Sequence, residues 1–312
     1  MKKAVMTNTY IPSRRTSGMP GAGIAGRLRT YLEFVKIEHT LFALPFAYAG
    51  AFLAAHGLPS LRLIVLIATA FTGMRTAAMT LNRIIDREID AANPRTANRH
   101  LPAGKISLRE AYLLLAISLL VYFVSAWLIN RVALELSPIP VAIAWIYPYM
   151  KRYTCLSHFV LGLTLAFAPI GGWVAVTDSF DPLGRELVPC VIGIAVAFWV
   201  AGFDIIYALQ DVEFDRSYGL YSAGARFGVR NALVISCLCH IAFFALLSYA
   251  LWVYGAGVKA IPGLAVIAVL LVYQHMIVTP RKYDEKRVQV AFFNANAAIS
   301  ALFFFTVVLA VF

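Results

Sequence analysis

The chain contains nine apolar segments of about 20 residues, the length that an α-helix needs to cross the hydrocarbon core of a bilayer. Hydrophobic residues make up 61% of its 312 residues and charged residues only 14%, whereas soluble proteins carry about 25% charge. These values exclude an ordinary soluble protein and predict an all-α integral membrane protein. The predicted spans are residues 37–56, 61–84, 108–129, 132–149, 157–177, 188–209, 231–254, 259–278 and 290–311.

Two segments precede the first span. Residues 1–23 are polar and basic and rich in Pro, Gly, Ser and Thr, and we expect a disordered basic tail there. From Ile24 onward, apolar residues recur at helical spacing with Arg27, Arg29 and Lys36 between them. This pattern predicts a helix that lies on the membrane surface. We expect residues 24–312 to form a single transmembrane domain.

Basic residues are distributed unequally among the predicted loops. With the N-terminus inside, the loops after even-numbered spans are cytoplasmic, and they hold most of the loop Lys and Arg residues. The opposite loops hold only Arg62, Arg131, Arg185 and Lys259. This asymmetry follows the positive-inside rule and supports a count of nine spans. It also accounts for the net charge of +11 without nucleic acid, which we do not expect as a partner.

Two short acidic segments follow the second and sixth spans. Asn82, Asp86 and Asp90 are spaced to share one helical face, and so are Asp204, Asp211 and Asp215. Ionisable groups at this depth are functional candidates. Both segments fall at cytoplasmic span ends, and their two spans run in the same direction. The sequence therefore predicts two four-helix halves in parallel repeat, with a ninth helix, around a central cavity.

Carboxylate and amide oxygens are the ligands that hard divalent cations prefer, and Mg²⁺ typically takes one or two carboxylates with phosphate oxygens and water. Arg95, Arg99, Lys105, Lys151 and Arg226 lie in the adjoining loops and are suited to an anion bound through the metal. Together these residues predict a diphosphate site. One alternative is that the acids simply pair with neighbouring Arg residues. Another is a membrane carrier of divalent cations or phosphorylated anions.

These motifs resemble the UbiA superfamily of intramembrane aromatic prenyltransferases. The family's N-x-x-x-D-x-x-x-D signature is matched by Asn82, Asp86 and Asp90. Its D-x-x-x-D signature is matched by Asp211 and Asp215, and its Y-x-x-x-K signature by Tyr147 and Lys151. The segment Arg95-Thr-Ala-Asn-Arg99 is similar to the 4-hydroxybenzoate polyprenyltransferase branch, whereas the segment around Glu38-His39 looks more like a menaquinone-associated branch. Arg83 departs from the pattern, because many members carry Asp there.

The resemblance implies a site for each reactant. Mg²⁺ is expected to bind Asn82, Asp86, Asp90, Asp204, Asp211 and Asp215, of which Asp86, Asp90, Asp211 and Asp215 are the expected catalytic residues. The diphosphate of a polyprenyl donor is expected to meet Arg95, Arg99 and Lys151, and Tyr147 is expected to line the substrate pocket. For an acceptor carboxylate, we select Arg152 as the cation. His158 has no partner spacing, and we interpret it as structural.

The implied activity is transfer of a polyprenyl group to an aromatic acid of quinone biosynthesis. The acceptor is 4-hydroxybenzoate or a dihydroxynaphthoate, and attachment to a porphyrin or chlorophyll precursor stays open. Membrane lipid is the expected surrounding, since a long isoprenoid cannot lie in water. We expect an integral protein of a bacterial inner membrane with its active site facing the cytoplasm.

Overall fold

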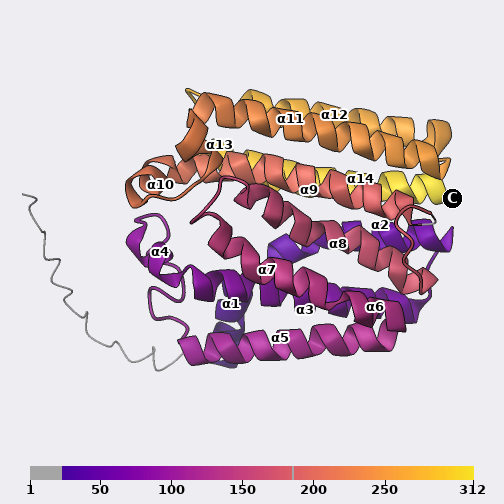
Figure 1. Cartoon of the computed structure of the whole chain (residues 1–312), viewed down its shortest axis with the longest axis horizontal. Helices are drawn as coiled ribbons and strands as arrows, with labels where there is room; N and C mark the ends of the chain where they lie inside the picture. The colour runs from indigo at the N-terminus through magenta and orange to yellow at the C-terminus, as the bar shows by residue number, and fades with distance from the viewer. Residues whose placement is uncertain (1–22, 185) are drawn as a thin grey trace, which may run out of the picture.

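The computed structural model describes residues 23–184 and 186–312. Within them the chain is almost wholly helical, and nine helical segments are long and apolar enough to cross a membrane. They lie side by side with their long axes in a similar direction, from α5 at one edge to α11 and α12 at the other (Figure 1). The predicted all-α membrane bundle is confirmed. Except for Gly23, the predicted disordered tail lies outside the described residues.

Most spans begin and end within a few residues of the predicted limits. They are α2 (Ile37–Ala55), α3 (Leu61–Ile85), α5 (Leu108–Ile129), α6 and α7 (Arg131–Leu136 and Pro138–Met150), α8 (Ser157–Thr177), α9 (Leu187–Ala208), α11 (Ala223–Tyr254), η2 and α12 (Gly257–Ala260 and Ile261–Ile277), and α13, η3 and α14 (Glu285–Gln289, Val290–Ala295 and Asn296–Val311). The short elements are α1 (Ile24–Val35), α4 (Arg87–Ala92), η1 (Leu209–Asp211) and α10 (Val212–Tyr218).

Local sequence explains where several of these helices begin or bend. Ser107 and Glu110 form a reciprocal capping box at the start of α5, which satisfies two backbone donors that would otherwise have no partner. The fourth span is divided at Ser137, because the prolines that follow have no backbone N–H to donate. α11 begins well before its predicted start, because a short helical segment from Ala223 joins it across a kink at Gly228. Gly228 has φ 80°, a conformation that favours glycine.

α8 packs closely against two neighbours, and this contact positions the rest of the bundle. A Cβ added at Gly172 would lie 1.8 Å from the Ala47 carbonyl oxygen of α2, and one at Gly162 would lie 2.2 Å from the Ala197 carbonyl oxygen of α9. Such approaches require glycine, and small residues at helix contacts are a feature of membrane bundles. α8 is therefore held between α2 and α9, and one of its faces is left to line the central cavity.

The predicted surface helix forms as α1, and Lys36 separates it from α2 in a left-handed conformation at φ 53°. Ile24 is 91% exposed and Leu28 57% exposed, so the apolar residues at the start of α1 do not pack on the bundle. This exposure agrees with a helix at a membrane surface, and that location stays a prediction.

Both acidic segments depart from the continuous helical face that their spacing predicts. α3 ends at Asp86, with φ −91° and ψ 4°, and the chain bends at Asp211 in nearly the same way, with φ −107° and ψ 6°. Each aspartate thereby begins a new short helix, where the dipole favours a carboxylate, instead of ending a long one, where the dipole opposes it. α4 and α10 lie at the same end of the molecule (Figure 1), as the predicted parallel repeat requires.

Candidate active site

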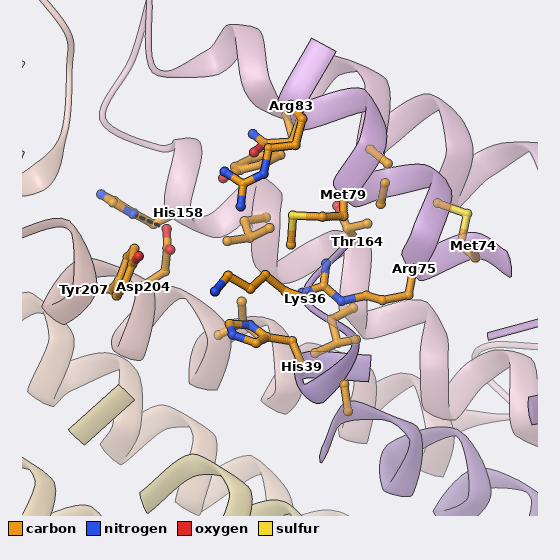
Figure 2. Close-up of a pocket in the computed structure, with 18 of the residues that line it drawn as sticks. Lys36, His39, Met74, Arg75, Met79, Arg83, His158, Thr164, Asp204 and Tyr207 are labelled. Atoms are coloured by element: carbon orange, nitrogen blue, oxygen red, sulfur yellow. Dashed lines mark hydrogen bonds and ion pairs between the residues drawn. The ribbon is translucent and has the colours of Figure 1, made fainter. Parts of the chain in front are cut away.

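A cavity of about 890 Å³ runs inside the bundle, within the range that is usual for ligand sites. Three of the predicted site residues, Lys105, Arg152 and Arg226, do not line it. The predicted residues that do line it are Asn82, Asp86, Asp90, Arg95, Arg99, Tyr147, Lys151, Asp204, Asp211 and Asp215. Figure 2 shows further lining side chains that converge on the same space from α3, α8, α9 and the α1–α2 junction, among them Arg75, Arg83 and Lys36.

Asp86 is the centre of the first acidic cluster and is 2% exposed. Its Oδ2 accepts a hydrogen bond from Lys151 Nζ at 2.6 Å and another from Asn82 Nδ2 at 3.0 Å. Burial raises the pKa of the Asp86 carboxyl, while Lys151 and Arg152 act in the opposite direction. Asp86 thus lies where a cation is needed to keep a buried carboxylate charged.

Asp90 lies one turn further on, in α4, and is also buried. Its Oδ1 accepts a hydrogen bond from Arg99 Nη1 at 2.6 Å, and Arg83 Nη1 lies 3.8 Å from its Oδ2. Arg83 therefore lines the cavity as a buried cation beside an acidic residue, at a position where the sequence departs from the UbiA pattern.

Asp211 is the centre of the second cluster and joins the two halves of the protein. Arg95 binds it through two nitrogens, Nε at 2.8 Å and Nη2, and Asn93 Nδ2 donates to it at 2.7 Å. Arg95 also donates to the Tyr207 hydroxyl at 3.0 Å. Burial opposes the charge of Arg95, yet its hydrogen bonds to Asp211 and Tyr207 raise its pKa overall. The loop after the second span is thereby fixed to the sixth span, as the predicted facing arrangement requires.

Asp204 and Asp215 are the other two predicted metal ligands that line the cavity. His158 Nδ1 lies 2.7 Å from Asp204 Oδ2, and the Ala223 backbone N–H donates to its Nε2 at 3.3 Å. Because Nε2 accepts, Nδ1 carries the proton that is shared with Asp204. Asp215 is buried near the start of α10, with 9% exposure. Figure 2 shows His158, Asp204 and Tyr207 grouped at one side of the cavity.

The residue types of the two clusters fit a magnesium ion. Asp86 Oδ1 and Asp90 Oδ2 are buried oxygens without a hydrogen-bond partner, so each has a lone pair to offer. In the part of the chain that the structure describes, no three His, Cys, Asp or Glu side chains form a ready-made metal site. Mg²⁺ typically takes one or two carboxylates and completes its shell with phosphate and water, and Asp86 and Asp90 can supply these carboxylates.

Arg152 occupies a different place from the one its predicted role requires. It does not line the cavity. Its Nη2 donates to the Ile85 carbonyl oxygen at 2.9 Å and lies 3.5 Å from Asp86 Oδ1. Arg152 therefore supports the C-terminal end of α3, whose last carbonyl groups have no partner within the helix. Its prediction as an acceptor-binding residue is not supported by this position.

Arg75 is a cavity-lining cation that has no such partner. It lies within α3, more than two turns before Asp86, and forms no hydrogen bond or ion pair with any side chain in the described ranges. Charged groups at this depth are costly unless they meet a partner or a ligand. Arg75 therefore faces the cavity, where a ligand could meet its charge.

Sequence reasoning missed the roles of Asn93 and His158. Asn93 bridges to Asp211 over 118 positions of the chain, and the only signal for it was its place in the loop between an acidic and a basic motif. His158 was interpreted as structural, and the structure shows in addition that it lines the cavity and contacts Asp204. Nothing in the spacing of a single histidine could have indicated this contact.

Comparisons with known proteins agree with this geometry. The model of the UbiA prenyltransferase family matches residues 43–309. The chain belongs to the UbiA prenyltransferase family. It is therefore a membrane-embedded prenyltransferase, and the resemblance drawn from its motifs is confirmed.

Members of the UbiA family resemble the chain over nearly their whole length. The 4-hydroxybenzoate octaprenyltransferase of Cronobacter sakazakii is 32% identical over 83% of this chain and 88% of its own. A UbiA homolog from Aeropyrum pernix, solved in its apo form, is 40% identical with a TM-score of 0.78, over 87% of this chain and 98% of its own. A UbiA homolog from Archaeoglobus fulgidus, solved with GPP and Mg²⁺, shares the fold, with 23% identity and a TM-score of 0.64 over 89% of this chain and 99% of its own.

Proposed function

We propose that this protein transfers a polyprenyl group from an isoprenoid diphosphate to an aromatic acid of quinone biosynthesis, either 4-hydroxybenzoate or a dihydroxynaphthoate. The observation that carries the proposal is the facing pair of acidic clusters. Asp86 and Asp211 line one cavity from two different spans, and each is accompanied by a basic side chain. Family membership favours this reaction over the transport of cations or anions.

In this proposal, the donor diphosphate binds at the end of the cavity where the two acidic clusters lie. Mg²⁺ would be held on one side by Asn82, Asp86 and Asp90 and on the other side by Asp204, Asp211 and Asp215. The Archaeoglobus fulgidus homolog, whose fold this chain shares, was solved with both GPP and Mg²⁺. When bound, the metal supplies positive charge that stabilises the leaving diphosphate.

The basic side chains have a second role in this proposal. The structure shows ion pairs between the site carboxylates and Arg95, Arg99 and Lys151. Once metal neutralises those carboxylates, the same side chains are free to bind phosphate oxygens, for which a guanidinium is well suited. Charge that develops on the diphosphate as the allylic C–O bond breaks then meets fixed cations in a site that excludes bulk water. An electron-rich aromatic ring attacks the allylic carbon and afterwards loses a ring proton.

Arg75 is our choice for the cation that binds the acceptor carboxylate. It lines the cavity and has no partner among the described side chains. An anion bound there would satisfy a buried charge, and a hydrogen bond to a charged group is worth about 1.5–3 kcal/mol. Arg152 is a less suitable choice, since it binds the end of α3 outside the cavity.

The decisive experiment uses the purified full chain in liposomes with Mg²⁺ and radiolabelled geranyl diphosphate. The acceptors are 4-hydroxybenzoate, a dihydroxynaphthoate and 4-hydroxybenzyl alcohol, which lacks the carboxylate. We expect a prenylated product from one of the acids and roughly tenfold less, or lower still, from the alcohol, because a charged hydrogen bond is lost. Absence of product from every acceptor would contradict the proposal, as would metal uptake without a prenyl donor.

Two arginine variants test the acceptor site. Arg75→Met should raise the KM for the aromatic acid by about tenfold or more, from the same hydrogen-bond energy, and leave the KM for geranyl diphosphate nearly unchanged. Arg152→Met is the matched comparison, and it should leave the acceptor KM nearly unchanged, because Arg152 lies outside the cavity and binds the end of α3. A larger increase of the acceptor KM in Arg152→Met than in Arg75→Met would contradict this choice and indicate that Arg152 binds the acceptor carboxylate.

A further inference from the structure

The cavity continues far beyond the groups that the proposed reaction uses. Its lining on α8 extends from Ser157 to Val174, a length of about 25 Å at 1.5 Å per residue. On α3 it extends from Asn82 back to Ile67. The hydrocarbon core of a bilayer is about 30 Å thick. The cavity therefore crosses most of the membrane, whereas the diphosphate and the aromatic acid need only the end near the acidic clusters.

The part of the cavity remote from the acids is apolar. We call it the far chamber, and define it by Ile67, Ala70, Tyr122, Ala133 and Gly171. The one hydroxyl in this set, on Tyr122, already donates to the Ser137 carbonyl oxygen at 3.2 Å. The chamber thus offers hydrocarbon surface to its contents and no free donor, which suits an apolar chain and disfavours a polar ligand.

Gly171 is the residue that leaves this chamber open. It lies on the cavity-lining face of α8, and a Cβ built on it would meet nothing within 4 Å. It is not among the glycines with positive φ, so neither its backbone nor its packing requires glycine. The neighbouring Gly172 is different, because its Cβ would collide with the Ala47 carbonyl oxygen at 1.8 Å. Because Gly171 has no side chain, the part of the far chamber next to it stays open.

In the proposed reaction, the distal isoprene units of the donor extend into the far chamber. We propose that Gly171 determines how long a donor the enzyme accepts. This inference rests on the proposed prenyl transfer, since it assigns the tail of the same substrate whose diphosphate lies between the acidic clusters. A larger side chain at Gly171 would fill the chamber and exclude long tails, while a short tail would still fit between the acids and α8.

The test compares geranyl diphosphate with octaprenyl diphosphate in the full chain with Mg²⁺. For Gly171→Phe, we expect kcat/KM for the octaprenyl donor to fall at least about tenfold relative to the geranyl donor, as steric exclusion from an apolar pocket commonly gives. A second readout is the thermal stabilisation of the protein by each donor, which should be lost for the long donor only. Leu163→Phe is the matched control, because Leu163 lies on the same helix, is 44% exposed and does not line the cavity. It should leave both donors unaffected.

The outcomes separate this inference from the proposed function. If the wild-type protein transfers neither donor, the proposed function fails. If the wild type is active and Gly171→Phe treats both donors alike, the inference fails, and the tail leaves the cavity by another route. Gly171→Ala covers the case in which the larger variant does not fold, since its methyl group enters open space. It should shift the preference toward the geranyl donor by a smaller factor, and an unchanged preference would overturn the inference.

Discussion

Each central carboxylate of the site is held by a cation that comes from outside its own helical turn. Lys151 binds Asp86, Arg99 binds Asp90, and Arg95 binds Asp211. Buried charges require such partners, since an isolated carboxylate in a low-dielectric interior is strongly disfavoured. These ion pairs satisfy the carboxylates of the site, and we expect metal and diphosphate to replace them.

Removal of one of these cations should destabilise the unliganded protein. In Lys151→Met, Asp86 stays buried, with its side chain 3% exposed in the native structure, but loses a partner at 2.6 Å. We expect the free energy of unfolding to fall by about 1–3 kcal/mol, the cost of an unsatisfied buried polar group, and the melting temperature to fall with it. Thermal unfolding in detergent without Mg²⁺ measures this effect.

The comparison for this prediction is a lysine on the adjoining loop. Lys105 is exposed and has no carboxylate partner among the described residues, so Lys105→Met should leave the melting temperature nearly unchanged. Lys151→Arg keeps the charge and should recover most of the stability. Equal melting temperatures for Lys151→Met and the wild type would show that the ion pair with Asp86 contributes nothing.

At the scale of single residues, the sequence predicted which side chains line the site better than which side chains they bind. Asp86 and Asp211 were found because their motifs are local, and every residue of the three matched signatures lines the cavity. The partners were harder to predict. Asn93 contacts Asp211 across 118 positions, and His158 contacts Asp204 across 46. Such pairs follow from how the spans pack, which no local pattern encodes.

At the scale of helices, the spans were predicted well because about 20 consecutive apolar residues have few alternatives in a membrane. Their interruptions were not. The spacing of the acidic residues predicted continuous helix through Asp86 and Asp211, whereas the structure has a helix end at Asp86 and a bend at Asp211. The i, i+4 spacing could not reveal this, since it is the same on both sides of a bend. The break at Ser137 was signalled by neighbouring prolines, yet the periodicity alone could not say whether the span was kinked or divided.

The packing of α8 gives a prediction about helix contacts. Gly172→Ala places a methyl group 1.8 Å from the Ala47 carbonyl oxygen, so α2 and α8 must separate. Overpacking of this kind costs about 1–3 kcal/mol, and we expect a lower melting temperature. Gly171→Ala is the adjacent control, and it should be neutral or slightly stabilising, because alanine is the better helix former. If the two variants melt alike, the close approach of α2 and α8 is not what holds them.

At the scale of the whole molecule, the distribution of basic residues predicts which end of the bundle faces the cytoplasm. The loops at the acidic end are the basic ones, and the positive-inside rule places them inside. Arg281 lies in a loop on that side, between α12 and α13, whereas Leu183 lies between α8 and α9 and is 90% exposed.

Cysteine labelling in intact cells tests this orientation. In a background without native cysteines, Leu183→Cys should react with a membrane-impermeant maleimide added outside, and Arg281→Cys should react only after the membrane is opened. The reverse pattern would place the acidic clusters on the outer face and contradict the predicted cytoplasmic site. The background requires replacement of Cys155, Cys190, Cys237 and Cys239.

In the proposed reaction, two acidic clusters from different spans act on one diphosphate. The most direct measurement is the Mg²⁺-dependent release of diphosphate from radiolabelled geranyl diphosphate with the acceptor present. Asp86→Ala and Asp211→Ala should each lower this rate by about 100-fold or more, as expected when a group that stabilises developing charge is lost. Glu88→Ala and Glu213→Ala, exposed acids on the same short helices, should keep wild-type rates, and chelation of Mg²⁺ should abolish release in all of them. Full activity in a folded Asp86→Ala or Asp211→Ala protein would contradict the claim.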